Sequence, residues 1–332
     1  MARTARAFWI RSPGHGEIRE EPLADPGPGE VLVRTRCSGI SRGTETLVFG
    51  GGVPPGQYRV MRAPFQEGDF PGPLKYGYLN VGTVEEGPGD LVGRTVFSLH
   101  PHQDLFTVPA DAVFPVPEGV PAERAVLAGT VETAVNALWD ASPLVGDRIA
   151  VVGAGMVGCC VARLASRIPG ARVQLVDVDP GRARTADALG VGFAAPAEAM
   201  GDCDLVFHAS ATEAGLTRSL ELLASEGEVV ELSWYGDRRV ILPLGGDFHS
   251  QRLAVRASQV GMISPARRSR YDHAERLGLA LRLLADPAFD ALLTGESAFE
   301  DLPSVLPRLA DGSLPALCHR IVYPWEDPRC SV

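Results

Sequence analysis

The sequence predicts an α/β protein of two domains, in which a doubly wound parallel sheet accompanies an irregular antiparallel β-barrel. The chain has 332 residues, which exceeds the length at which a single hydrophobic core usually keeps growing. Residues 5–117 contain short β-like runs separated by Gly and Pro clusters, as in antiparallel barrels. Residues 121–265 instead alternate strand-like and helix-like segments, which is typical of a parallel sheet with crossover helices.

The individual elements follow from local patterns of apolar residues. The first region reads as strands because β-branched and aromatic residues lie between turn residues, in GEVLVRTRCSGI (29–40), NVGTVEE (80–86), RTVFSL (94–99) and LFTVPADAVFPV (105–116). The second region has strands in DRIAVVG (147–153), RVQLVDV (172–178), DLVFHAS (204–210) and EVVELS (228–233). Helical periodicity appears between and after them, in VGCCVARLASRI (157–168), GRARTADALG (181–190), GLTRSLELLA (215–224) and HAERLGLALRLLA (273–285).

Composition excludes several classes of partner. The chain is 45% apolar and 22% charged, as in ordinary globular proteins. A net charge of −10 argues against nucleic-acid binding, which needs clustered Lys and Arg. No apolar run is long enough for a membrane span or a secretory signal. The six cysteines, at positions 37, 159, 160, 203, 318 and 330, form no disulfide or CxxC pattern, so we expect a cytoplasmic protein.

The strongest chemical signal is the glycine motif of IAVVGAGMVG, which follows an apolar strand and opens a helix. Gly153, Gly155 and Gly158 have GxGxxG spacing, and Met156 and Val157 begin the helix whose N-terminal N–H groups would receive a pyrophosphate. In this motif the first glycine permits the tight turn, the second admits the ligand and the third allows close helix packing. The pattern predicts a dinucleotide site, and the alternative is a buried βαβ unit that binds nothing.

An acidic residue after the next strand indicates which dinucleotide is preferred. Asp177 ends VQLVD, at the distance where a carboxylate takes a ribose 2′-hydroxyl and repels a 2′-phosphate. This favours NAD(H) over NADP. Arg182 and Arg184 lie nearby and point in the opposite direction, and Arg182 is a candidate cofactor contact.

Several longer motifs resemble one family of oxidoreductases. The runs GEVLVRTRCSGISRGTE, GTVETAVNAL and AFEDLPSVLPRLADG resemble the medium-chain dehydrogenase/reductase superfamily over nearly the whole chain. GYLNVGTV, VVELSWYG and GDFHSQRLAVRASQVG are similar to the branch named for bacteriochlorophyllide a dehydrogenase. The resemblance implies a GroES-like catalytic domain at 1–120, a Rossmann NAD(H)-binding domain at 121–285 and a return to the catalytic domain at 286–332.

The same resemblance implies that zinc is absent. Zinc-dependent members use Cys, His and Cys ligands at the positions that are Ser41, Tyr78 and Gly129 here, and none of these is a good zinc ligand. The four-cysteine lobe of a structural zinc site is also missing. A replacement site built from Cys37, His100 and His102 is not supported by their spacing.

Without a metal, a protein hydroxyl must stabilise and protonate the oxygen of a carbonyl that receives hydride. Tyr78 occupies a vacated ligand position, Ser41 is a candidate proton relay, and His102 or His100 is a candidate for exchange with solvent. The alternative is that Tyr78 only fills volume. Glu45 is a further candidate, either as an acid/base group or as a helix-start acid.

The remaining candidates come from the resemblance and from sheet topology. Glu132 is either a catalytic acid/base group or an ion-pair partner of Arg42 or Lys75. In the family pattern, Arg42 reaches the cofactor pyrophosphate, and the alternative is that Arg42 is a solvated surface residue. Thr133 packs on the nicotinamide in the same pattern. Ligands of open α/β sheets gather at the carboxyl ends of the strands. Two further cofactor candidates lie at such strand ends, Ser210 and Trp234. Trp234 is alternatively a core residue.

Taken together, these patterns predict a zinc-independent NAD(H)-dependent oxidoreductase that interconverts a secondary alcohol and a ketone of a small-molecule substrate. An enone C=C reductase is the alternative within enzymes. A non-catalytic NAD(H)-binding redox sensor is the alternative of another class. Relatives of this kind commonly pair edge strands of their nucleotide domains, so we expect a homodimer through LAVRASQVG.

Overall fold

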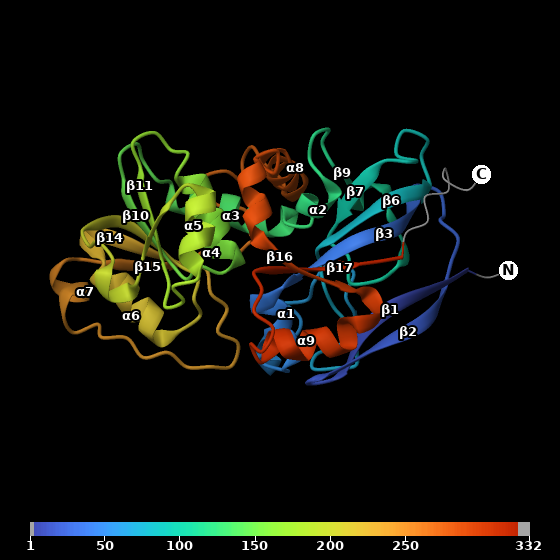
Figure 1. Ribbon diagram of the computed structural model, residues 1–332, viewed down its shortest axis with the longest axis horizontal. Coiled ribbons are helices and arrows are strands. Elements are labelled where there is room, and N and C mark those ends of the chain that lie inside the picture. Colours follow the sequence, from blue (N-terminus) through green and yellow to red (C-terminus); the bar gives the residue numbers. More distant parts are fainter. Residues whose placement is uncertain (1–2, 325–332) are drawn as a thin grey trace. The chain divides into compact units, whose positions relative to one another are not determined.

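The computed structural model describes residues 3–324, and these form two compact units, each visible in Figure 1. One unit contains the described residues of Met1–Gly129 and Leu293–Val332, and the other contains Thr130–Leu292. We call the first the β-rich unit and the second the α/β unit. Within residues 3–324, no helix is both long and apolar enough to cross a lipid bilayer.

The α/β unit is built on a six-stranded parallel sheet. Its strands are β10 (Arg148–Val152), β11 (Arg172–Val176), β12 (Gly192–Ala194), β13 (Cys203–His208), β14 (Leu223–Glu231) and β15 (Ala254–Ala257). The strand order is β12-β11-β10-β13-β14-β15, and every neighbouring pair is parallel. This is the order of a Rossmann sheet, whose direction of growth reverses between β10 and β13. The predicted doubly wound fold is confirmed.

Helices connect and cover these strands. They are α3 (Ala128–Ala141), α4 (Met156–Ala165), α5 (Arg182–Leu189), α6 (Glu213–Glu221), α7 (Asp247–Ser250) and α8 (His273–Leu283). Leu216 and Leu220 of α6 are buried in one core cluster with Ala150, Val152 and Val206 of β10 and β13. The amphipathic helix predicted at 273–285 is α8, which begins with a capping box in which Asp272 and Glu275 each accept the other's backbone N–H.

The β-rich unit contains two sheets of mostly antiparallel strands. Its strands are β1 (Arg3–Ser12), β2 (His15–Leu23), β3 (Glu30–Ser41), β4 (Glu67–Gly68), β5 (Leu74–Lys75), β6 (Asn80–Glu86), β7 (Thr95–Ser98), β8 (Leu105–Pro109), β9 (Phe114–Pro115), β16 (Leu293–Ala298) and β17 (Cys318–Val322). One sheet has the order β2-β1-β5-β4, and the other has the order β16-β17-β3-β6-β7-β9 with β8 also paired to β3. Strands from both ends of the chain therefore share a sheet, as the adjacent blue β3 and red β17 of Figure 1 show.

One strand pair of this unit is parallel, and it lies outside residues 5–117, for which antiparallel strands were predicted. Strands β16 and β17 are parallel, because α9 (Leu302–Ala310) lies between them in sequence and provides the crossover that a parallel pair requires. The other helices of the unit are α1 (Arg42–Phe49) and α2 (Ala122–Ala125). Strand β3 ends at Ser41 and α1 starts at the next residue, so this junction carries several of the predicted site residues.

Candidate functional site

The glycine turn between β10 and α4 has the geometry of a dinucleotide site. Gly153 has φ +108°, and a Cβ there would lie 2.7 Å from the backbone nitrogen of Ser210. A Cβ on Gly158 would lie 2.0 Å from the Gly153 carbonyl oxygen, whereas one on Gly155 would meet no atom within 4 Å. No side chain caps α4, whose N-cap residue is Gly155. The first and third glycines are therefore needed for packing, and the second leaves room for an anion at the helix N-terminus.

Asp177 is held against this turn. It directly follows β11, and its Oδ2 accepts the Ala154 N–H at 2.7 Å while its Oδ1 accepts the Asp179 N–H at 2.9 Å. Arg182, the first residue of α5, lies with its Nε 3.3 Å from Asp179 Oδ2. The carboxylate of Asp177 is thus fixed at the carboxyl end of β11, and the Arg182 guanidinium is engaged by a different acid.

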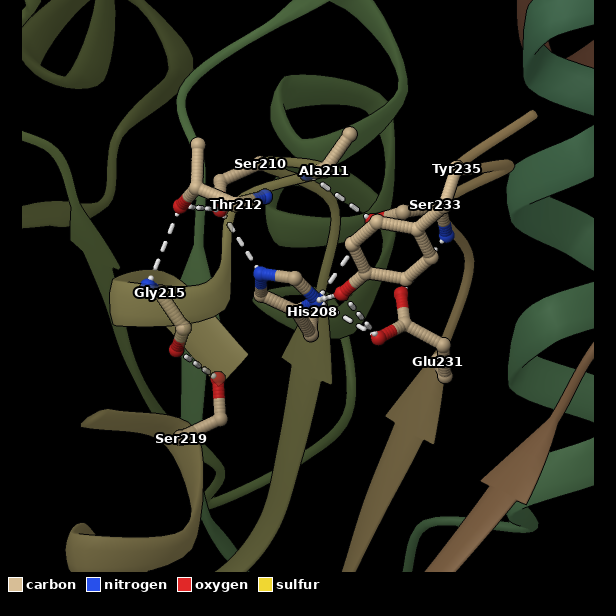
Figure 2. Close-up of polar contacts among 9 residues, drawn as sticks. All are labelled: His208, Ser210, Ala211, Thr212, Gly215, Ser219, Glu231, Ser233 and Tyr235. Carbon is tan, nitrogen blue, oxygen red and sulfur yellow. Dashed lines mark hydrogen bonds and ion pairs between the residues drawn. The ribbon is translucent and has the colours of Figure 1, made fainter. Parts of the chain in front are cut away.

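A polar cluster lies at the carboxyl ends of β13 and β14, and Figure 2 shows it. The buried imidazole of His208 has Nε2 at 2.6 Å from Ser210 Oγ and Nδ1 at 2.7 Å from Glu231 Oε2. Tyr235 donates its hydroxyl to the same carboxylate oxygen at 3.0 Å, and the Ser233 N–H donates to Glu231 Oε1 at 2.7 Å. Hydrogen bonds from His208 and Ser233 outweigh the effect of burial, which alone would raise the pKa of Glu231, and leave that pKa below its ordinary value.

Sequence reasoning selected Ser210 but missed His208, Glu231 and Tyr235. The available signal was a polar residue near the end of each of two apolar strands, LVFHAS and VVELSW. His208 and Glu231 are partners in the register of β13 and β14, so the parallel alignment of these strand ends brings the two side chains together.

In the β-rich unit, four polar residues lie close together near the junction of β3 and α1. They are Ser41, Thr44, Glu45 and Tyr78. The hydroxyls of Ser41 and Thr44 hydrogen-bond to the phenol of Tyr78. Burial, and secondly the charge of Glu45, raise the pKa of Tyr78 above its ordinary value, and these two hydrogen bonds act in the opposite direction. The Ser41 N–H donates to Glu45 Oε1 at 2.7 Å. The structure therefore brings Tyr78, Ser41 and Glu45 together, with Thr44 as a member that sequence reasoning missed.

A chain of buried polar groups extends from Glu45 into the unit. Its Oε2 lies 2.8 Å from His102 Nε2, His102 Nδ1 lies 2.7 Å from Ser38 Oγ, and Ser38 Oγ lies 3.0 Å from Tyr323 Oη. His102 is 1% exposed, so it does not exchange protons with solvent directly as the sequence-based hypothesis held. Ser38 and Tyr323 were not predicted, because Tyr323 lies 285 residues from Ser38 in sequence.

His100, the other histidine considered for proton exchange, is a packing residue. Its ring stacks on Phe106 with centroids 3.8 Å apart, and its Nδ1 lies 3.1 Å from the Pro101 carbonyl oxygen. Burial lowers the pKa of His100 to about 3. The imidazole therefore remains neutral near pH 7.

We expect His100 to make the fold acid-sensitive. The unfolded chain takes up this proton near the ordinary histidine pKa of about 6.5, whereas the folded chain does so only near about 3. Stability that is fully present above about pH 6.5 is therefore lost as the pH falls toward about 3, and the loss at about pH 5 is about 2 kcal/mol. His100→Phe should reduce the difference in unfolding free energy between about pH 7 and about pH 5 by this amount, measured by urea denaturation. An equal difference in both proteins would contradict the assignment.

Glu132 belongs to a different environment from the one predicted. Its Oε1 accepts from Arg276 Nε at 3.0 Å, and Arg276 Nη1 donates to Asn136 Oδ1 at 2.6 Å. Arg276 is 1% exposed. Burial raises the pKa of Glu132, and Arg276 opposes this. The predicted partners Arg42 and Lys75 are wrong, because Arg276 occupies the carboxylate and Lys75 contacts Glu21 and Glu67.

The other predicted cofactor residues are placed as follows. Met156 is buried and Val157 is half-buried at the start of α4. Arg42 is the first residue of α1 and Thr133 lies on α3, and both are half-buried. Trp234 is half-buried just after β14, so it is not a member of the core.

Metal-ligating side chains do not converge in the described part of the chain. No group of three or more His, Cys, Asp or Glu residues within 3–324 has the geometry to hold a metal ion. The described cysteines are free and buried, and burial raises the pKa of Cys37 to about 12. Cys330 lies outside the described residues.

The parallel sheet and the glycine turn define a Rossmann-type fold, and comparisons with known proteins indicate an oxidoreductase. The chain is 30% identical over 236 residues to 2-desacetyl-2-hydroxyethyl bacteriochlorophyllide A dehydrogenase of Cereibacter sphaeroides, covering 64% of this chain and 69% of that protein. It is 30% identical over 229 residues to L-threonine 3-dehydrogenase of Rhizobium rhizogenes, covering 60% and 64% of the two chains. No protein-family model matches the chain.

A solved structure shows the same fold at low sequence identity. L-idonate 5-dehydrogenase from Escherichia coli matches with a TM-score of 0.79 and 17% identity, over 97% of this chain and 99% of that one. The chain belongs to the medium-chain dehydrogenase/reductase superfamily, and it is an oxidoreductase of that type.

Proposed function

We propose that the protein is a zinc-independent, NAD(H)-dependent oxidoreductase that interconverts a secondary alcohol and a ketone of a small-molecule substrate. The observation that carries the proposal is the hydrogen-bonded cluster of Tyr78, Ser41 and Thr44 beside Glu45. Tyr78 and Ser41 stand where zinc-dependent members of the superfamily have metal ligands. These residues do not fit zinc, so we derive no step through a metal.

The α/β unit has the residues to hold the dinucleotide. Gly153, Gly155 and Gly158 form the turn into α4, and a Cβ on Gly155 would meet no atom within 4 Å, so a pyrophosphate would fit at this helix N-terminus. The fixed carboxylate of Asp177 would accept hydrogen bonds from the adenosine ribose. When bound, NAD(H) supplies or accepts the hydride.

The Tyr78 phenol is suited to protonate the substrate oxygen. When Ser41 and Thr44 donate to its oxygen, the phenol hydrogen stays available for donation to another acceptor. Burial and Glu45 keep this group protonated, because they raise its pKa. In the direction of ketone reduction, Tyr78 Oη–H would donate to the carbonyl oxygen and give up its proton as the alcohol forms.

The buried chain behind Glu45 would control where protons reside near Tyr78. If Tyr323 donates to Ser38 Oγ and Ser38 Oγ–H donates to His102 Nδ1, then His102 Nε2–H donates to Glu45 Oε2. This tautomer holds the Glu45 carboxylate in a fixed orientation. The charge of Glu45 in turn disfavours loss of the Tyr78 proton before substrate is present.

Asp177→Ala should weaken NADH binding and relax cofactor preference. Loss of hydrogen bonds to a charged group should raise the Kd for NADH by about 10- to 100-fold, while the Kd for NADPH changes less because a 2′-phosphate is no longer repelled. Fluorescence titration with both dinucleotides measures the ratio. Asp187→Ala, at an exposed residue of the adjacent α5, is the matched control and should leave both values unchanged. An unaltered NADH to NADPH ratio in Asp177→Ala would count against the ribose assignment.

A substrate panel separates the proposal from its alternatives. NADH oxidation with ketones, together with reverse oxidation of the matching alcohols, supports the proposed reaction. Turnover confined to enones would instead establish C=C reduction, with the same phenol polarising the carbonyl. Tight NADH binding with no oxidation by either class would favour a redox sensor.

We also retain a homodimer as a proposal. Strand β15 is at the edge of the six-stranded sheet, and all four of its residues are exposed. An exposed edge strand is a template for pairing with another chain, so β15 of a second copy would extend the sheet across a two-fold axis.

A further inference from the structure

Phe65 is a partly exposed aromatic residue at a turn position that favours glycine. The turn is formed by residues 63–66, in which the Gln66 N–H donates to the Ala63 carbonyl oxygen at 3.2 Å. Pro64 has the second position, and Phe65 has the third with φ +55°. Turns with a positive φ at the third position ordinarily have Gly or Asn there, and this φ is an outlier for a bulky residue. The backbone therefore disfavours phenylalanine at this position.

Neighbouring side chains hold this turn in place. Gln66 is buried, and its Oε1 accepts the Ala63 N–H at 3.2 Å. Arg62 Nη2 donates to the Gln66 carbonyl oxygen at 3.0 Å. Backbone strain persists only where the surrounding structure imposes it, and strained residues are concentrated at active sites and ligand-binding sites. The strain at Phe65 therefore indicates a role for its side chain in binding a ligand.

The Phe65 ring is the outermost of three aromatic rings in contact. Its centroid lies 5.6 Å from that of the His100 ring, and the His100 ring is stacked on Phe106 with centroids 3.8 Å apart. Phe106 and His100 are buried, whereas Phe65 is 37% exposed. The fold thus buries only part of the Phe65 side chain, and the exposed part of the ring can accept another flat ring.

The pairing of two short strands brings Phe65 beside the segment that carries Tyr78. In the antiparallel pair β4 and β5, Glu67 is opposite Lys75. The residues just before β4 therefore run beside the residues just after β5. Phe65 comes two residues before Glu67, and Tyr78 comes three residues after Lys75, so Phe65 and Tyr78 belong to neighbouring segments.

Contacts with residues 100–102 give the same placement. Phe65 contacts this segment through the His100 ring. A Cβ on Gly77, the residue before Tyr78, would lie 3.0 Å from His102 Cδ2. Strand pairing and these contacts therefore agree that Phe65 is near the phenol proposed as proton donor.

A row of aromatic rings also joins the Gly- and Pro-rich segment 50–73 to Tyr78. The rings of Tyr58 and Phe70 have centroids 5.6 Å apart, those of Phe70 and Tyr76 are 5.9 Å apart, and those of Tyr76 and Tyr78 are 6.0 Å apart. Phe70 and Tyr76 are buried. The segment that presents Phe65 is therefore packed against the neighbours of Tyr78 by aromatic contacts.

We propose that Phe65 determines substrate specificity by binding an aromatic ring of the substrate, so that the preferred ketones carry a flat aromatic ring. The inference rests on the proposed function. The substrate ring contacts the exposed part of the Phe65 ring while the carbonyl oxygen accepts from the Tyr78 phenol. Aromatic pairs attract in offset-stacked or edge-to-face arrangements through their π-systems, and a saturated ring of the same size lacks this attraction.

Two matched ketones test the preference. 4-Phenyl-2-butanone and 4-cyclohexyl-2-butanone share one carbon skeleton and an unconjugated carbonyl, and only the first has a flat ring. With NADH as reductant, we expect kcat/KM of the wild-type protein to be about tenfold higher for the phenyl ketone. The difference should appear mainly in KM, because a contact remote from the carbonyl acts equally on bound substrate and transition state.

Variants of Phe65 separate ligand binding from a role in the fold. Phe65→Gly should raise KM for the phenyl ketone by about tenfold and reduce the preference to about onefold. The urea midpoint of unfolding should not fall in this variant, because glycine accepts the positive φ. Phe65→Trp retains an aromatic ring and should keep the preference. A purely structural role would instead lower the midpoint in Phe65→Gly and weaken turnover of both ketones equally.

Val92 provides the control for loss of an exposed apolar side chain. The exposed large apolar residues described in the β-rich unit are Val60, Phe65 and Val92, and Val92 lies between β6 and β7, outside segment 50–73. Val92→Ala should leave KM for both ketones and the preference unchanged.

Two results would overturn the inference alone. These are equal kcat/KM values of the wild-type protein for the two ketones, or a Phe65→Gly variant with the wild-type preference. Failure to oxidise NADH with any ketone would overturn the proposed function, and the inference with it.

Discussion

Tyr78→Phe lowers kcat by about 10²- to 10³-fold, because it removes a proton donor that acts on the substrate oxygen in the transition state. The Kd for NADH stays at its wild-type value, since the glycine turn and Asp177 lie in the other unit. The change deletes one oxygen and retains the ring, so the packing of the segment is preserved. Steady-state ketone reduction and NADH titration measure the two quantities separately.

The neighbouring tyrosine provides the matched control. Tyr76 is 5% exposed, and its ring lies edge-on to Tyr78 with centroids 6.0 Å apart. Tyr76→Phe makes the same chemical change two residues away and should leave kcat unchanged. Wild-type turnover in Tyr78→Phe, or an equal loss in both variants, would return Tyr78 to a packing role.

Glu132→Ala lowers the free energy of unfolding by about 3–5 kcal/mol, since it leaves the Arg276 guanidinium buried without its carboxylate. Asn136 and the Val260 carbonyl oxygen still accept from Arg276, but they carry no neutralising charge. Urea denaturation followed by tryptophan fluorescence measures the loss, because Trp139 lies on the same helix as Glu132.

Two comparisons test this interpretation of Glu132. Glu221→Ala removes the ion-pair partner of Arg218, and the Arg218 and Glu221 side chains are 27% and 54% exposed. This variant should lose less than about 1 kcal/mol of unfolding free energy. The double variant Glu132→Leu, Arg276→Met removes both charges and should recover most of the stability lost in Glu132→Ala. A loss in Glu132→Ala no larger than in Glu221→Ala would show that the buried pair is unimportant for the fold.

The parts of the fold that depend on local sequence were predictable. The GxGxxG spacing indicated the β10–α4 turn, because Gly153 has a positive φ and Gly158 packs against the Gly153 carbonyl oxygen five residues before it. The alternation of strand-like and helix-like segments indicated the parallel sheet. The helix predicted at 273–285 begins with a capping box formed by Asp272 and Glu275. These features are specified by local patterns of glycine, apolar and capping residues.

The site was predictable only in part, since its remaining contacts join residues far apart in sequence. Glu132 pairs with Arg276, 144 residues away, and His102 reaches Ser38 across 64 residues. The His208 cluster depends on the register of β13 against β14, which no local pattern specifies. Tyr78, Ser41 and Glu45 were identified through family resemblance and residue chemistry, whereas their hydrogen-bond partners required the fold.

Turnover by metal-depleted protein shows whether the reaction needs zinc. The chain is dialysed against a chelator, its zinc content is measured by mass spectrometry, and NADH-dependent ketone reduction is then assayed on the same sample. We expect an unchanged kcat with far less than one zinc per chain, and a loss of activity only when the Tyr78 hydroxyl is removed. Loss of turnover on chelation that returns in proportion to added zinc would contradict it.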